Sequence, residues 1–305
     1  MKFIVVLLTL GLSIQANAEQ TIIYGEDNRV DVDQMDQPQI KHISKSIAGR
    51  VLNFKIEDVD AHKVSFGEPA LLSDPWRGNV CADERFASQP TVTDCTGFLV
   101  GEDLLVTAGH CLTPGGTKVE NATTRACDSY SWVFDYKVDG NDEFDLNSVP
   151  KKNVYKCKEV IFAIHEREDD YAIIKLDRKV EGREPLKLST KKPALESEIF
   201  VIGHPSGLPL KYADGAQVKI MHENFFAANL DTFGGNSGSP VFNKVTNEVE
   251  GILVRGDTDY VMSQFEGESC RRVNTCDNNL ENCQEDAPDI TGEHVSLIEK
   301  VKKYL

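Results

Sequence analysis

A serine flanked by glycines is the residue in this sequence whose surroundings best suit covalent chemistry. Ser237 lies in the run Gly-Gly-Asn-Ser-Gly-Ser-Pro at residues 234–240. Glycine adopts backbone angles that other residues avoid, and such angles would let the amides of Gly235 and Ser237 point together at one oxyanion. The run predicts a nucleophilic serine with an oxyanion hole, and an ordinary surface loop is the alternative interpretation.

A serine hydroxyl is a poor nucleophile near neutral pH, so it needs a base within hydrogen-bond reach. Histidine has a suitable ordinary pKa, about 6.5. His110 follows the apolar run 104–106 and directly precedes Cys111, whose disulfide would hold the turn that carries the imidazole. The remaining candidate bases lack such a context and are interpreted as structural or surface residues: His165, His204 and His222.

The imidazole in turn needs a carboxylate that holds its tautomer and stabilises its cation. Asp170 comes directly before the apolar run Tyr-Ala-Ile-Ile-Lys-Leu at residues 171–176. A strand of this kind would carry the aspartate into a region of low dielectric constant, where its bond to His110 is stronger. Asp169 is the second candidate.

Short apolar runs separated by Gly, Pro and Asn must position these residues, and they are typical of all-β sandwiches and barrels. Residues 97–100 and 104–106 predict a hairpin that ends at His110. An apolar stripe predicts a C-terminal helix; its residues are Ile290, Val295, Ile298, Val301 and Leu305. Further strands are predicted in residues 160–164, 171–176, 198–202, 241–242 and 251–254.

Composition limits the partners of this 305-residue chain, which carries a formal net charge of −16. Such a charge repels phosphate backbones and anionic lipids, so we expect no nucleic-acid partner and no membrane-surface partner. A solvated acidic surface is the simplest interpretation, although it could also attract basic substrates. We expect no cofactor.

An export signal is predicted at residues 1–18, because Lys2 precedes a mostly apolar run and Ala-Asn-Ala at 16–18 is a small-residue cleavage pattern. The run is shorter than the roughly 20 residues that span a bilayer, which argues against an anchor. We therefore expect a secreted monomer, extracellular or periplasmic, that does not contact the membrane after signal removal.

Eight cysteines follow the signal, and an even number in an exported chain predicts disulfides. Zinc is the alternative, but Cys270, Cys276 and Cys283 lack the close Cys-x-x-Cys pairing of a metal site. The run 139–145 concentrates oxygen ligands and could hold calcium, yet it lacks the spacing of an EF-hand and is interpreted as a polar turn. No metal is therefore predicted. The cysteines are at positions 81, 95, 111, 127, 157, 270, 276 and 283.

The segments 107–111, 170–176 and 235–240, in the order His, Asp, Ser, together resemble the chymotrypsin/trypsin family over roughly residues 90 to 305. The resemblance implies an all-β fold of two packed six-stranded antiparallel barrels, and a serine endopeptidase that cleaves protein or peptide substrates. It also implies a disulfide between Cys95 and Cys111, which leaves fifteen connectivities for the other six cysteines. The domain would cover residues 76–305, after a segment 19–75 that is either a removable pro-segment or an arm of the domain.

Within the family, residues 235–243 are more similar to the bacterial glutamyl-endopeptidase branch than to animal trypsins. The uncharged Asn236 makes activation through a salt bridge to a new amino terminus doubtful. Residues 22–29 resemble the start of mature enzymes of that branch. About sixty residues before Cys95 then form an insertion whose role the sequence leaves open.

Specificity is predicted from Asp231, six residues before the serine. The resemblance places it in the specificity pocket with Thr232 and Phe233, where a carboxylate would select Arg or Lys. A strand end or a shifted alignment is the alternative. Arg255 keeps open a preference for acidic residues. A catalytically silent barrel that binds a protein partner is the competing function.

Overall fold

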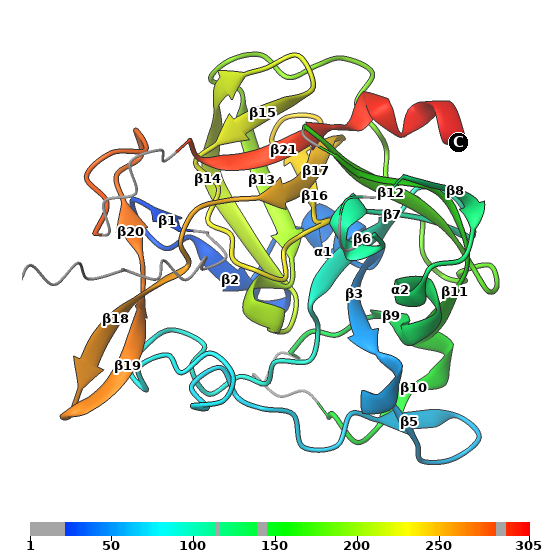
Figure 1. Ribbon diagram of the computed structural model, residues 1–305, viewed down its shortest axis with the longest axis horizontal. Coiled ribbons are helices and arrows are strands. Elements are labelled where there is room, and N and C mark those ends of the chain that lie inside the picture. The colour runs from blue at the N-terminus through cyan, green and yellow to red at the C-terminus, as the bar shows by residue number, and fades with distance from the viewer. Residues whose placement is uncertain (1–21, 114–115, 117, 139–144, 167, 285–290) are drawn as a thin grey trace, which may run out of the picture.

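The computed structural model describes residues 22–113, 116, 118–138, 145–166, 168–284 and 291–305. They form two closed six-stranded antiparallel β-barrels with few helices, as expected for the fold class (Figure 1). The predicted export signal and most of the 139–145 run lie outside the described residues. Among the residues described, no helix is long and apolar enough to cross a membrane.

The first barrel contains the hairpin predicted before His110. In pairing order its strands are β12 (Asp169–Leu176), β7 (Leu104–Thr107), β6 (Cys95–Leu99), β3 (Ile47–Leu52), β9 (Tyr130–Phe134) and β11 (Val154–Glu166). The barrel closes because β11 also pairs with β12, and a short additional strand, β8 (Val119–Ala122), pairs with β11.

The second barrel carries the strands that flank Ser237. It closes through the pairing of β13 with β14, and β2 (Arg29–Asp31) extends it beyond β14. In pairing order its strands are β13 (Glu198–Gly203), β16 (Pro240–Asn243), β17 (Val249–Arg255), β21 (Glu293–Leu297), β15 (Phe225–Ala228) and β14 (Lys211–Met221).

Alternation along β13 shows how the barrels are built. Ile199 and Val201 belong to the apolar cluster of the second barrel. Phe200 and Ile202 belong to a larger cluster that also includes Ile173 of the first barrel. Since successive side chains of a strand point to opposite faces, one face fills the barrel and the other packs against its neighbour. Residues buried on both faces explain why the predicted strands appear as continuous apolar runs.

The C-terminal stripe is helical only in part, which corrects the range of the predicted helix. Residues 293–297 form strand β21, which pairs with both β15 and β17. Two 3-10 turns follow, η6 (Ile298–Lys300) and η7 (Lys302–Tyr304). Two ladders of backbone hydrogen bonds and the burial of Val295 outweigh the helical spacing. Ile290 lies outside the described residues.

Part of the 19–75 segment belongs to the barrels, because β3 is one of the six strands of the first barrel and β2 pairs with the second. The barrel strands therefore begin before residue 76. Whether a pro-segment is removed stays a prediction.

Several short elements lie outside the two barrels. They include the hairpin of β18 (Tyr260–Phe265) and β19 (Glu268–Val273), which projects at the lower left of Figure 1. The other strands are β1 (Ile23–Tyr24), β20 (Thr275–Cys276), β4 (Glu57–Asp58), β5 (Lys63–Ser65) and β10 (Val149–Pro150). The helices are α1 (Pro38–Ser44) and α2 (Arg125–Ser129), with 3-10 turns η1 (Val32–Gln34), η2 (Asn53–Lys55), η3 (Gly109–Cys111), η4 (Lys151–Asn153) and η5 (Pro205–Gly207).

All eight cysteines form disulfides, as their even number predicts. Cys95 bonds Cys111, the pair that the family resemblance implies. The other three bonds, which the sequence left open, are Cys81–Cys270, Cys127–Cys157 and Cys276–Cys283.

Candidate active site

The loop that carries Ser237 depends on two glycines with positive φ. Gly235 has φ 97° and Gly238 has φ 90°. A Cβ at Gly238 would lie 2.1 Å from the carbonyl oxygen of Thr96, so no other residue fits there without displacing backbone. The Gly238 amide donates to the Leu253 carbonyl at 2.7 Å, and the Thr96 amide donates to the Ser237 carbonyl at 2.8 Å. The two barrels therefore hold this loop between them.

The amides of Gly235 and Ser237 are the predicted oxyanion-hole donors. Within the described part of the chain, neither donates a hydrogen bond to a protein group. The hydroxyl of Thr96 donates to the Gly235 carbonyl at 2.9 Å. This bond orients the peptide group that follows the Gly235 amide. Both donors are thus available to a ligand.

His110 and Asp170 meet where η3 and β12 come together. The His110 ring lies with its Nδ1 2.8 Å from Oδ2 of Asp170, and the His110 backbone amide donates to Oδ1 at 3.0 Å. The carboxylate thus receives both bonds from one residue. Nδ1 therefore carries the proton, and Nε2 has the free lone pair that a base needs.

Asp170 is 1 % exposed. Burial by itself raises the pKa of its carboxyl, but the hydrogen bonds and the charge of His110 outweigh burial and hold this pKa below its ordinary value. Ser296 of β21 donates its hydroxyl to the Asp170 carbonyl at 3.0 Å, so the second barrel also fixes the aspartate. Asp170 is consequently ionised at neutral pH.

Asp169, the second candidate, has a different partner. Its Oδ1 accepts a hydrogen bond from the ammonium group of Lys300. Adjacent strand residues point to opposite faces, so only one of the two carboxylates reaches His110.

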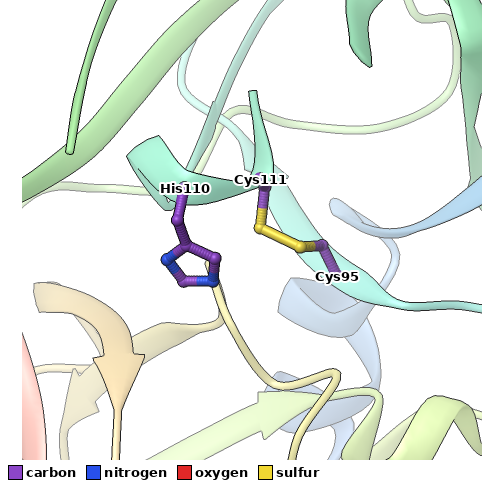
Figure 2. Close-up of side chains that lie close together, drawn as sticks. All are labelled: Cys95, His110 and Cys111. Atoms are coloured by element: carbon purple, nitrogen blue, oxygen red, sulfur yellow. A yellow bond between two sulfur atoms is a disulfide. The ribbon is translucent and has the colours of Figure 1, made fainter. Parts of the chain in front are cut away.

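The Cys95–Cys111 disulfide lies beside His110, and Cys111 also contacts the Ser237 loop. Figure 2 shows the imidazole beside this bond, and Sγ of Cys111 lies 3.7 Å from the Ser237 carbonyl oxygen. The backbone of Ser237 therefore lies next to the turn that carries His110. Among the described residues Ser237 Oγ makes no hydrogen bond, His110 Nε2 included, and such bonds are often long before substrate binds. Cys95, His110 and Cys111 gather metal-ligand atom types, but both sulfurs are committed to the disulfide.

His165, interpreted from the sequence as a structural or surface residue, lies beside His110 and Asp170. It lies opposite Asp170 in the β11–β12 ladder. Its ring centroid is 5.5 Å from that of His110, and its Nε2 is 3.9 Å from Oδ2 of Asp170. The signal that could have indicated this neighbour is its position five residues before Asp170, because the pairing of β11 with β12 brings these two residues opposite each other.

The two other histidines make structural contacts. His204 is buried, stacks on Tyr136 and shares a hydrogen bond of 2.9 Å with the Leu208 carbonyl. Burial lowers the pKa of His204 to about 4, so it is neutral. His222 stacks on Phe225 at 4.2 Å between ring centroids.

Asp231 is buried beside the N-terminal segment. Its carboxylate oxygens accept hydrogen bonds from the backbone amides of Tyr24 and Asn28, both at 2.9 Å. Burial raises the pKa of Asp231 to about 7 although these two bonds lower it. Both oxygens are therefore occupied by residues of the same chain.

Thr232 contacts a buried acid that the sequence did not indicate. Its hydroxyl donates to Oε2 of Glu293 on β21, whose other oxygen accepts from the Asp257 amide at 3.4 Å. Burial raises the pKa of Glu293 well above its usual range, and the charge of Asp257 raises it further. Burial therefore favours the neutral form of Glu293. No motif marks it, because only the pairing of β21 brings it to Thr232.

Arg255 lies at the end of β17, opposite His294 of β21. Burial lowers the pKa of His294 to about 4, and the positive charge of Arg255 contributes to this shift. The charge of Arg255 therefore affects a residue on a neighbouring strand of its own barrel.

Two closed barrels with a serine loop between them define a chymotrypsin-like serine endopeptidase. The model of a family described as "Trypsin-like peptidase domain" matches residues 95–252, just over half of the chain, and the chain belongs to that family. Membership implies protein or peptide substrates.

Similar solved structures include neuropsin, a serine protease expressed in the limbic system of mouse brain. It is 14 % identical, with 70 % of this chain and 87 % of that chain covered and a TM-score of 0.45. A Glu endopeptidase structure is 15 % identical, with 83 % of this chain and 94 % of that chain covered and a TM-score of 0.40. No curated protein matches the chain.

Proposed function

We propose that this protein is a secreted endopeptidase that forms an acyl-enzyme on Ser237, with His110 as the base and Asp170 as its orienting carboxylate. The observation that carries the proposal is the double contact of Asp170 with the ring and the backbone amide of His110. This contact holds one tautomer of one imidazole beside the Ser237 loop.

In the proposed first half-reaction, Nε2 of His110 takes the proton of Ser237 Oγ while this oxygen attacks the scissile carbonyl. The negative oxygen of the tetrahedral adduct accepts hydrogen bonds from the amides of Gly235 and Ser237. Each such donor contributes about 2.7–4 kcal/mol to lowering the barrier in measured cases. Asp170 stays ionised and stabilises the imidazolium; the reference triad for these roles comes from the same family.

His110 then returns the proton from Nε2 to the nitrogen of the leaving amine, and the carbon–nitrogen bond breaks. A water molecule enters, gives its proton to Nε2 and attacks the acyl carbon. Collapse of the second adduct releases the new carboxyl end and regenerates the hydroxyl of Ser237. Apart from this water molecule, no group outside the chain and its substrate is needed to balance these steps.

For specificity we propose cleavage after Arg or Lys. The support is the set of buried carboxyl groups around Thr232, which comprises Asp231, Asp257 and Glu293. Burial raises the pKa of Glu293, and a bound cation would lower this pKa because opposite charges favour each other's charged form. Asp231 makes a weaker direct contribution, since Tyr24 and Asn28 already occupy its oxygens.

Export is part of the proposal, and so is action as a monomer. Four disulfides are typical of an oxidising compartment, and they agree with a cleavable signal at residues 1–18. Amino-terminal sequencing of protein recovered outside the cell should then begin near residue 19, and retention of Met1 would contradict the signal.

A fluorophosphonate probe tests the mechanism. Folded wild-type protein should carry one label, Ser237→Ala should carry none, and Asp169→Asn should label normally as a matched control. Absence of label on the folded wild type would overturn the proposal and leave the silent partner-binding barrel as the better hypothesis.

Profiling with a peptide library then tests specificity. Cuts after Arg and Lys support the buried carboxyls, whereas cuts after Glu would refute their role and favour a glutamyl endopeptidase.

A further inference from the structure

Residues 66–93 and the β18–β19 hairpin together form a structure beside the two barrels. Cys81 bonds Cys270 of β19, the Cys81 amide donates to the Arg271 carbonyl at 2.9 Å, and the Arg271 amide donates to the Asn79 carbonyl at 2.8 Å. In Figure 1 the cyan loop meets the hairpin at the lower left. A covalent bond and backbone pairing thus fix the insertion whose role the sequence left open.

Residues of these two segments, of the serine loop and of the turn η5 line an open cavity of about 560 Å³. Pockets that bind ligands typically measure about 300–1,000 Å³. Its wall includes Gly235, whose amide is one of the two proposed oxyanion donors. The cavity therefore lies next to the residue that would hold the oxygen of the scissile carbonyl. The lining residues used in the argument are Arg77, Asp94, Gly234, Gly235, Asp259 and Arg271.

Two arginines on this wall bond to uncharged groups. Arg77 donates to the Thr91 hydroxyl at 3.0 Å and to the Ser206 carbonyl at 3.2 Å. Arg271 donates to the Gly78 carbonyl at 2.6 Å. Within the described chain neither guanidinium forms an ion pair, so the positive charge of both remains uncompensated.

The acids on the same wall are already engaged. Asp94 forms an ion pair with Arg50 at 2.8 Å, and Asp259 accepts a hydrogen bond from the Gly234 amide at 3.1 Å. In a chain with a net charge of −16, the described wall of this cavity therefore carries the positive charges of Arg77 and Arg271 against the single negative charge of Asp259, because Asp94 is paired with Arg50.

We propose that this cavity is an accessory substrate subsite that binds an acidic side chain of the polypeptide. The proposal rests on the proposed function. A compact cavity of 560 Å³ is about 10 Å across, which corresponds to about three residues of extended chain at 3.3 Å each. An acidic residue two or three positions from the cleaved bond would reach Arg77 and Arg271, to which its carboxylate would make charge-assisted hydrogen bonds.

Internally quenched decapeptides with one bond cut by the wild type test the subsite. Glu is compared with Gln two and three positions from that bond, on each side. At one position Glu should raise kcat/KM about tenfold, the effect of roughly one hydrogen bond to a charged group. Added salt should weaken this advantage. Arg77→Gln should reduce the preference for Glu over Gln to within twofold. Arg178 does not line the cavity, so Arg178→Gln should retain the preference.

Filling the cavity is the second test. Thr258→Trp should lower kcat/KM for the decapeptide about tenfold or more and leave hydrolysis of p-nitrophenyl acetate within twofold. Ser88→Trp, at the separate 620 Å³ cavity, is the matched control and should change neither.

The two proposals fail in different ways. Normal ester hydrolysis with equal cleavage of Glu and Gln peptides by the wild type would overturn the subsite alone. A preference for Glu that survives Arg77→Gln would do the same. Loss of ester hydrolysis and of labelling in the wild type would overturn the proposed function.

Discussion

Replacing His165 with alanine is expected to lower kcat/KM by loosening the His110 ring. The His165 ring lies edge-on to the His110 ring at 5.5 Å between centroids, and its Nε2 lies 3.9 Å from Oδ2 of Asp170. The imidazole of His110 is therefore packed against a second ring as well as bonded to the carboxylate. Without that ring, His110 would sample more orientations and would meet the Ser237 hydroxyl less often.

The size of this effect follows from the contact between the two rings. An edge-to-face aromatic pair contributes about 0.5–1.5 kcal/mol. Since about 1.36 kcal/mol corresponds to a factor of ten in rate, full loss of the contact corresponds to about a twofold to tenfold decrease in kcat/KM. The two side chains are 28 % and 37 % exposed, which favours the lower part of this range.

The assay is kcat/KM for p-nitrophenyl acetate at one fixed pH. His165→Phe, which keeps a ring beside His110, should retain more of the activity than His165→Ala. His222→Ala, which changes a histidine stacked on Phe225, is the matched control and should leave kcat/KM unchanged. A kcat/KM of His165→Ala equal to that of the wild type would refute the reasoning.

Three further predictions concern the proposed triad, the serine loop and the buried Asp231. Asp170→Asn should lower kcat about 10⁴-fold with an unchanged melting temperature, as in the reference triad of this family; retention of a tenth of the activity would contradict the assignment. Gly238→Ala should lower the free energy of unfolding in urea by at least about 2 kcal/mol more than Gly267→Ala. The angle φ is positive at both residues, but only at Gly238 would the added Cβ lie 2.1 Å from a backbone oxygen. Equal decreases would show that the serine loop adjusts to the added methyl group. The pKa of Asp231 is raised to about 7. Its contribution to the free energy of unfolding is therefore fully present below about pH 3.8 and is lost as the pH rises through 7. Asp231→Asn should reduce this loss by up to about 4 kcal/mol, and an unchanged dependence of the free energy of unfolding on pH would contradict the raised pKa.

Much of the fold was predictable where the local pattern was strong. The apolar runs 171–176 and 198–202 lie within β12 and β13, and the hairpin before His110 is β6 with β7. These strands are buried on both faces, which makes them continuous apolar runs, and turn residues mark their ends.

Strand β21 was not predictable from its own residues. Its spacing fits a helical stripe, and only pairing with β15 and β17 makes it a strand. The same pairing brings Glu293 to Thr232, two residues that are 61 positions apart. No local signal carries such a contact, because the energy lies in a ladder whose other half is elsewhere in the chain.

The sequence by itself determined which residue types were available for chemistry and in what order: a serine among glycines, a histidine beside a cysteine, and an aspartate before an apolar strand. Their types and local backbone preferences are properties of short segments. The tertiary structure alone decided which neighbours these residues contact: His165 beside the Asp170 carboxylate, Tyr24 and Asn28 on Asp231, and the loop that Cys81–Cys270 joins to the β18–β19 hairpin. The first contact depends on the pairing of β11 with β12, and the others join segments about 190 or more residues apart, so none is a property of a short segment.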